Sequence, residues 1–273
     1  MFLCLNDFMF CFFAISPHAP VLAPTVGKEE AAKKAIKTID AMKDLEEKLY
    51  LTRPDTIVVL SPHGNPPPGT FVIELDKEYN LNLKEFGDFK TKKKFLAASN
   101  LIESIRHGAI DAGLPVSLDT YEKLNYGASI PLLLLTAHLP KIKIVPINTS
   151  DLDLKTHFEF GKIIREAIAK SGSERVAIIA SADLSDKLRD DSPGGFSSRG
   201  KEFDETLLRY IETKNITGIL GLDSELIKDG GGCGLKSIAT LLGAMDKINY
   251  EPQTFSYEAP FGVGLLVEHF KLS

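Results

Sequence analysis

Short, continuous apolar runs rich in β-branched residues recur along the chain and predict buried strands. The clearest of them span residues 10–15, 55–61, 142–148 and 175–181. Strands that are covered by helices on both faces have this pattern, because neither face of the sheet meets water. Less regular runs predict further strands at residues 70–75, 253–258 and 262–270.

Between these runs, apolar side chains recur at helical spacing. In residues 28–51, for example, Ala31, Ala35, Ile39 and Met42 share one face and lysines and acids occupy the other. The same periodicity predicts helices at residues 90–112, 128–138, 154–170, 200–213 and 235–245. Alternating strands and helices predict an α/β protein: a single three-layer α/β/α domain with a mostly parallel central sheet.

The domain is expected to span residues 9–273, with residues 1–8 as a loose N-terminal extension and Met9 as an alternative start. The first sixteen residues are as apolar as a signal peptide, but they lack a basic start and contain Asp7. They are also too short to cross a bilayer.

Composition narrows the classes of function. Formal net charge is −5, which provides no basic surface and argues against nucleic acid or an anionic membrane as a partner. Three cysteines at unrelated spacings predict no disulfide framework, and a reducing cytoplasm fits them best. A homo-oligomer remains compatible with the sequence.

Two strands end in the same short motif. Residues 14–18 read AISPH and residues 59–63 read VLSPH, so His18 and His63 each follow a Ser-Pro pair. Proline fixes φ and restricts its neighbour, so both histidines are held by backbone. Rigid placement suits metal ligands, although a histidine at a strand end is also commonly a hydrogen-bonded structural residue.

A metal held by two histidines needs a third ligand from elsewhere in the chain. Glu258 is the candidate, because it ends a predicted strand and precedes a proline and closely spaced glycines. Two histidines and one carboxylate point first to non-haem Fe(II), with Zn(II) or another divalent ion as the rival. Solvated acids are also common at strand ends.

Several other features are expected to be structural. The run GGGCGLKS at residues 230–237 does not fit a phosphate-binding loop, because Leu235 interrupts its Gly-Lys-Ser and no strand precedes it. Cys233 is expected to be a small buried residue. The remaining histidines are expected in structural or surface positions: His107, His138, His157 and His269.

The motifs together resemble a known family. SPHAPVLAPTVG, DTIVVLSPHG, YGASIPLLLL, RVAIIASADLS, CGLKSIATLLGA and SYEAPFGVGLLV occur between about residues 14 and 270, in the order found in the class III (LigB-type) extradiol dioxygenase superfamily. The similarity is strongest to its Memo-like, AMMECR1-associated branch. These enzymes cleave catechol rings with Fe(II), which binds the diol and O2. The resemblance implies that His18, His63 and Glu258 match the metal ligands.

Two departures from the family pattern concern proton transfer. A family motif like Asp-His-Gly reads Asn125-Tyr126-Gly127 here, and one like Asp-Leu-Ser-His ends in Asp186. The resemblance therefore puts Tyr126 and Asp186 in the catalytic positions. Histidine exchanges protons near neutral pH, whereas tyrosine and an ordinary aspartate do not.

Three functions remain open from the sequence. The first is an Fe(II)-binding extradiol-dioxygenase-like protein, acting on a small aromatic diol and O2 with reduced or changed activity. The second is a non-catalytic Memo-like metal-binding or scaffold protein. The third is a zinc-dependent hydrolase on the same ligands.

Overall fold

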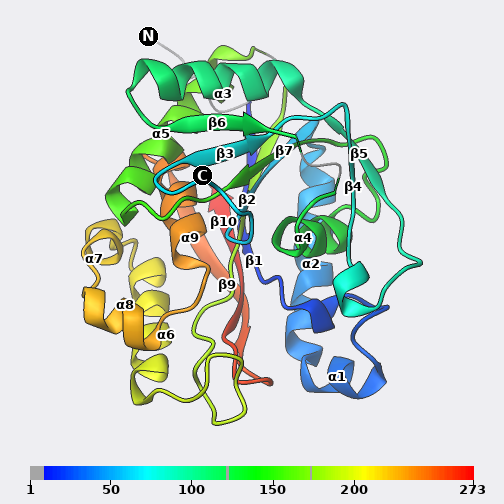
Figure 1. The fold of residues 1–273 in the computed structure, drawn as a ribbon, viewed down its shortest axis with the longest axis vertical. Coiled ribbons are helices and arrows are strands. Elements are labelled where there is room, and N and C mark those ends of the chain that lie inside the picture. Colours follow the sequence, from blue (N-terminus) through cyan, green and yellow to red (C-terminus); the bar gives the residue numbers. More distant parts are fainter. Residues whose placement is uncertain (1–8, 121–122, 173) are drawn as a thin grey trace.

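A computed structural model describes residues 9–120, 123–172 and 174–273. It shows one mixed sheet with helices on both faces, which confirms the predicted three-layer α/β/α architecture (Figure 1). The extension expected at residues 1–8 lies outside the described residues.

The sheet is built around five parallel strands. Its order is β4-β5-β7-β2-β8-β1-β10-β9. Strand β3 pairs with the carboxyl end of β7 on one side and with β6 on the other. Antiparallel pairings border this parallel centre: β10 joins β1 to β9, β4 pairs with β5, and β3 pairs with β7. The strands are β1 (Phe10–Ser16), β2 (Thr56–Ser61), β3 (Phe71–Glu74), β4 (Glu78–Asn80), β5 (Lys94–Ala97), β6 (Val116–Asp119), β7 (Lys143–Asn148), β8 (Val176–Ser181), β9 (Tyr250–Glu258) and β10 (Leu265–Leu272).

Helices α2 and α4 cover one face of the sheet, and α3, α5, α6 and α9 cover the other (Figure 1). The helices are α1 (Glu29–Lys34), α2 (Ile36–Thr52), α3 (Ser99–Asp111), α4 (Tyr126–Leu135), α5 (Leu154–Lys170), α6 (Ser198–Glu212), α7 (Ile216–Leu220), α8 (Ser224–Gly230) and α9 (Leu235–Ala244), with short 3₁₀ turns at Pro20–Leu22 and Lys84–Phe86.

Strand β1 shows why its apolar run is continuous. Phe12 and Ala14 face the core under α2, whereas Phe13 and Ile15 face the core under α5 and α9. All four side chains are fully buried. Because successive side chains of a strand point to opposite faces, a strand between two helical layers needs apolar residues at every position.

The helix predicted at residues 28–51 is interrupted. The chain forms α1 and then α2, with Ala35 between them at φ −104° and ψ 27°, outside the helical region. Ala35 is buried and its own side chain caps neither helix. The break lets α2 begin at a new point, beside the end of β9.

The helix predicted at residues 90–112 is wrong in its first half. Residues Lys94–Ala97 form β5, and helix begins only at Ser99. Phe95 is buried, and β5 pairs with both β4 and β7. Pairing with distant strands overrides the helical preference of this lysine-rich stretch.

The parallel strands β1, β2 and β8 end at a common edge of the sheet. In open sheets of this kind, ligands bind beyond the carboxyl ends of the strands. No helix in the described part of the chain has the length and hydropathy required to cross a membrane.

Candidate metal centre

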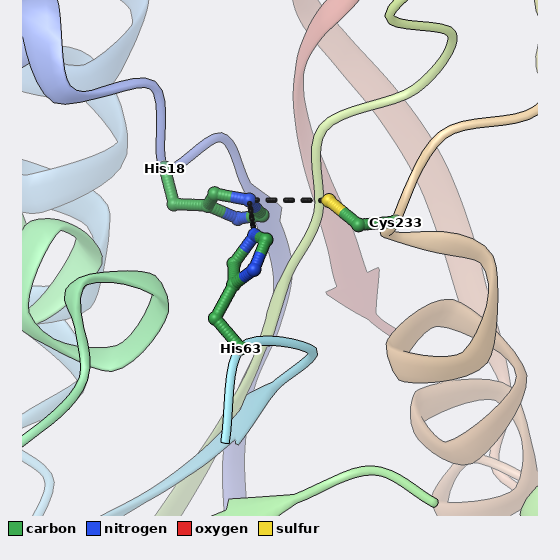
Figure 2. Close-up of side chains that lie close together, drawn as sticks. All are labelled: His18, His63 and Cys233. Atoms are coloured by element: carbon green, nitrogen blue, oxygen red, sulfur yellow. Dashed lines mark hydrogen bonds between the residues drawn. The ribbon is translucent and has the colours of Figure 1, made fainter. Parts of the chain in front are cut away.

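His18 and His63 meet beyond the ends of β1 and β2. Each follows its strand by two residues, and their Nε2 atoms lie 2.8 Å apart (Figure 2). The two rings are nearly perpendicular, with 83° between their planes. The pairing predicted from the repeated Ser-Pro-His motif is therefore present in the folded chain.

Ser181, the last residue of β8, fixes the orientation of His18. Its hydroxyl lies 2.5 Å from the Gly127 carbonyl, which has no hydrogen to give, so the hydroxyl donates there. The same oxygen, 2.8 Å from Nδ1 of His18, then accepts the Nδ1 hydrogen. This assignment leaves Nε2 of His18 with a free lone pair directed at the cluster.

Both histidines are held in the neutral form. His18 is 1% exposed, and burial lowers its pKa to about 3. Burial and, to a smaller extent, the neighbouring His18 lower the pKa of His63 to about 4. A neutral imidazole is the form that binds a metal, so neither ring needs to lose a proton near neutral pH.

Cys233 joins the two histidines, which corrects the expectation that it is only a small buried residue. Its Sγ lies 3.3 Å from Nε2 of His18 (Figure 2). Burial, reinforced by the nearby Asp183, raises the pKa of this thiol to about 12. The flanking glycines allow the approach: a Cβ on Gly232 would lie 1.6 Å from the Leu184 carbonyl oxygen.

Asp183 holds the turn that carries His18. Its Oδ1 accepts the backbone N–H of His18 at 2.9 Å, and its Oδ2 lies 3.6 Å from Nε2 of the same residue. Burial raises the pKa of Asp183 to about 7, although the N–H groups of His18 and Ala19 oppose the shift. Sequence reasoning assigned no role to Asp183.

Glu258 is placed against α2. Its Oε1 accepts hydrogen bonds from the backbone N–H of Thr38 at 2.8 Å and from the Thr38 hydroxyl at 2.7 Å. Thr38 is the third residue of α2, so the carboxylate caps a helix whose own preceding residue provides no cap. Among the described residues, the side chains with ligand atoms within 4.8 Å of one another are His18, His63 and Cys233.

The two positions expected to take part in proton transfer lie in different surroundings. Tyr126 stacks on His63 at 4.2 Å between ring centres, with its hydroxyl 2.9 Å from Nε2 and 3.0 Å from Nδ1. Burial raises the pKa of Tyr126 well above its ordinary value. Asp186 lies between β8 and α6, and its buried Oδ1 has no hydrogen-bond partner in the described structure.

A chain of hydrogen bonds runs from the His63 turn into the core. The His63 N–H donates to Ser61 Oγ at 3.3 Å, and Ser61 donates to Asn125 Oδ1 at 2.6 Å. Asn125 donates to Asn148, and Asn148 donates to Glu74, each at 2.9 Å. Because amide nitrogens only donate and carboxylates only accept, every bond in this chain has a defined direction.

Glu74 terminates the chain at the end of β3. It is 1% exposed, and burial raises its pKa to about 7. Asn125 also accepts the backbone N–H of Ala128 and so caps α4, the helix that begins at Tyr126. The amide of Asn125 therefore orients both the His63 turn and the tyrosine stacked on it.

The cluster fits a divalent metal by its chemistry. Two ligands of one ion, each about 2.0–2.1 Å from it, lie no more than about 4.2 Å apart. The 2.8 Å between the two Nε2 atoms satisfies this limit. Both nitrogens are neutral, and one is oriented by Ser181 in the manner of metal-binding histidines.

Comparison with known proteins points to one family. Residues 12–268 match the family described as "Catalytic LigB subunit of aromatic ring-opening dioxygenase". A Clostridium acetobutylicum protein, CA_C1420, is 28% identical in an alignment 261 residues long, and the match covers 92% of this chain and 55% of that protein. The chain thus spans about half the length of this relative.

A solved structure has a similar fold. The crystal structure of the uncharacterized protein JW3007 from Escherichia coli K12 superimposes with a TM-score of 0.60. The alignment covers 84% of this chain and 91% of that chain, at 16% sequence identity. At this identity the likeness concerns the fold.

Proposed function

Because the chain belongs to the LigB family of aromatic ring-opening dioxygenases, we propose that it is an Fe(II)-dependent, extradiol-dioxygenase-like enzyme. Its substrates in this proposal are a small aromatic diol and O2, in a reducing cytoplasm. One observation supports the proposal above all. Two neutral imidazoles converge at the carboxyl edge of a parallel sheet, 2.8 Å apart.

His18 and His63 hold the metal in this proposal, and Glu258 is the carboxylate ligand by its match to the family motif. When bound, Fe(II) supplies a centre at which a diol and O2 meet. Glu258 caps α2 through Oε1, which leaves Oε2 for this role. Asp183 is the rival carboxylate, because its Oδ2 lies 3.6 Å from Nε2 of His18.

Tyr126 and Asp186 determine how the ring-cleavage chemistry differs from that of the family. The Tyr126 hydroxyl, beside His63, orients a bound diol by hydrogen bonding but holds its proton because its pKa is raised. Asp186 replaces a histidine and is the remaining candidate for proton transfer. We therefore propose that ordinary catechol cleavage is slow.

Cys233 favours a second candidate. Zinc binds thiolate and imidazole ligands more readily than ligands that are all carboxylates. The Sγ atom of Cys233 lies 3.3 Å from Nε2 of His18. A chain that binds zinc through His18, His63 and Cys233 would be a hydrolase or a non-catalytic metal-binding protein.

Two measurements on one preparation test these functions. Elemental analysis of anaerobically purified protein identifies the metal, and an oxygen electrode then records uptake with a panel of catechols. Iron at one equivalent with slow, saturable oxygen uptake supports the dioxygenase. Zinc that survives iron loading, with no oxygen uptake, supports the second candidate and contradicts the first.

A further inference from the structure

One buried carboxylate is not part of the metal cluster. Asp204 lies on α6 and is 1% exposed, and no cation of the described residues forms an ion pair with it. Burial raises its pKa to about 6, although hydrogen bonds from Tyr257 and Ser185 oppose the shift. A buried carboxylate without a cation is costly, and an apolar residue of similar volume is often at least as stable. Stability alone therefore does not favour an acid at this position.

The two oxygens of Asp204 accept hydrogen bonds from two different elements. Oδ1 accepts the backbone N–H of Ser185 at 2.8 Å, in the turn after β8. Oδ2 accepts the hydroxyl hydrogen of Tyr257 at 2.6 Å, near the end of β9. Ser185 directly precedes Asp186, and Tyr257 directly precedes Glu258. One carboxylate therefore joins the backbone next to the candidate for proton transfer to the backbone next to the proposed carboxylate ligand.

The turn at Ser185 needs this carboxylate as an acceptor. Ser185 is fully buried, and Oδ1 of Asp204 accepts its N–H. A Cβ on Gly264 would lie 2.2 Å from Oδ2 of Asp204, so only a glycine leaves room for the carboxylate here. Without Asp204, the Ser185 N–H would be a buried donor with no acceptor. The turn would then shift toward water or another acceptor.

The same turn carries the two acids beside the cluster. Oδ1 of Asp183 accepts the N–H of His18 at 2.9 Å. Burial raises the pKa of Asp183 and that of Cys233, and the charge of Asp186 adds to both shifts. Asp186 is therefore close enough to act on the cluster. A movement at Ser185 changes the positions of both acids and, through Asp183, the turn of His18.

The end of β9 is held from both faces of the sheet. Successive residues of a strand point to opposite faces, so Tyr257 reaches α6 whereas Glu258 reaches α2. The Tyr257 hydroxyl is bound to Asp204, and the Glu258 carboxylate is bound to Thr38. Loss of the bond to Asp204 would leave this strand end fixed from one face alone.

We propose that Asp204 is a positioning residue of the metal site. Through Ser185 it fixes the turn of Asp183 and Asp186, and through Tyr257 it fixes the strand end that carries Glu258. The inference rests on the proposed function for the roles of Asp186 and Glu258, but its effect on metal binding is measured without turnover.

The test compares variants that differ in the hydrogen bonds they keep. Asp204→Leu removes both acceptors. Asp204→Asn keeps both links, because its Oδ1 accepts the Ser185 N–H and its amide donates to the Tyr257 oxygen. Leu207→Ala is the matched control. Leu207 is fully buried on the same helix, so its truncation leaves a cavity and weakens α6 without changing the carboxylate.

The first measurement is the affinity of the full chain for Zn(II), obtained by competitive titration with a chelator. Asp204→Leu should bind zinc about tenfold more weakly, because groups that orient metal ligands contribute about 10- to 100-fold in affinity. Asp204→Asn should bind zinc like the unmodified chain. Leu207→Ala should also do so, although its melting temperature falls.

The second measurement is oxygen uptake by the Fe(II)-loaded chain with 4-methylcatechol. A reacting group displaced by about 1 Å costs up to about 10²-fold in rate, so Asp204→Leu should lower kcat about 10- to 100-fold. KM should change little, because Asp204 does not touch the substrate. Asp204→Asn should restore kcat.

Tyr257→Phe is a milder change that keeps the proposal testable if Asp204→Leu does not fold. It removes the link to β9 and leaves the bond to Ser185, so the chain should fold and bind zinc more weakly than the unmodified protein. Normal zinc affinity in Tyr257→Phe would contradict the link to Glu258.

The two proposals fail in different ways. Weaker zinc binding by Asp204→Leu, without oxygen uptake by any variant, supports the positioning role and contradicts the proposed oxidative function. Oxygen uptake and zinc affinity that are the same in all variants support the proposed function and overturn the positioning role. An equal loss of zinc affinity in Leu207→Ala would also overturn it, because the stability of α6 would then be the cause.

Discussion

The His18 side and the His63 side of the cluster have different surroundings. On one side, Ser181 and Asp183 hold His18 in a buried, neutral and oriented state. On the other side, Tyr126 stacks on His63, at a position where the sequence resemblance predicts a histidine in the family. In the proposed function, binding a metal and moving protons are separate requirements, met by separate side chains. One can be altered while the other is kept.

The largest expected effect is on metal binding, when one of the two imidazoles is removed. His18→Ala should abolish stoichiometric binding of iron or zinc, with at least about a hundredfold loss in affinity, because in the proposed function it deletes a direct ligand. Metal content and a competitive chelator titration measure this loss. His107→Ala, on the exposed surface of α3, is the control and should bind metal normally.

Histidines at the two positions proposed for proton transfer should raise the rate of ring cleavage. Asp186→His, combined with Tyr126→His, should raise ring cleavage about a hundredfold, since a positioned acid–base group contributes about 10²–10⁴-fold in rate. Metal affinity should change little. Asp190→His, at an exposed position in the same segment, controls for added imidazole. Fast cleavage by the unmodified chain that is lost in Asp186→Asn would contradict this account.

Glu258 tests whether a carboxylate takes part in metal binding or only caps α2. Glu258→Gln keeps an oxygen that can accept from Thr38, so α2 should remain capped and the melting temperature unchanged. If the carboxylate is a ligand as proposed, metal affinity should fall about 10- to 100-fold. Full metal binding in this variant would leave Glu258 as a cap alone.

Glu258→Ala also removes the cap. It should lower the free energy of unfolding by about 0.5–2 kcal/mol, as measured by denaturant titration. Thr38→Val weakens the same cap without touching the carboxylate, and its metal content should be normal.

A smaller effect concerns how the stability of the folded chain changes with pH. Glu268 is fully buried in β10, and burial raises its pKa from the ordinary 4.5 to about 7. The neutral form is favoured in the folded chain, so its contribution to stability is complete below pH 4.5 and is lost as the pH rises through 7.

Glu268→Gln stays neutral at every pH. It should therefore lose less stability between pH 5 and pH 8 than the unmodified chain, by on the order of 1 kcal/mol. Urea titrations at both pH values measure this. Glu251→Gln, at an exposed position of β9, should show no such change. Parallel pH profiles for Glu268→Gln and the unmodified chain would show that Glu268 is not the cause.

The parts of the fold that the sequence predicted are those that local chemistry determines. Strands β1, β2, β7 and β8 are buried on both faces, so their apolar runs are continuous and easily recognised. Strand β5 was missed because its residues become a strand only by pairing with β4 and β7. The break at Ala35 was missed for a similar reason, since the cap of α2 comes from β9, far along the chain.

The residues of the candidate site likewise fall into those that local sequence predicts and those that it does not. His18 and His63 were found because their Ser-Pro-His turns are local signals. Cys233 was missed because only the folded arrangement brings its loop against residues 182–184. The clustered glycines around Cys233 were a usable signal, since glycines mark close backbone approach. The carboxylates show the limit of such reasoning, because a position at a strand end does not determine where a side chain points.

The directed hydrogen bonds from Ser61 to Glu74 have an evolutionary consequence. If Asn125 became the aspartate of the family motif, it could no longer donate to Asn148. Asn148 would then have to turn its own amide toward position 125 and withdraw its donor from Glu74. Glu74, whose pKa burial already raises to about 7, would then have to be protonated in order to donate to the turned amide oxygen of Asn148. Asn125, Asn148 and Glu74 are therefore coupled: an aspartate beside Tyr126 requires either a protonated Glu74 or a second change deep in the core.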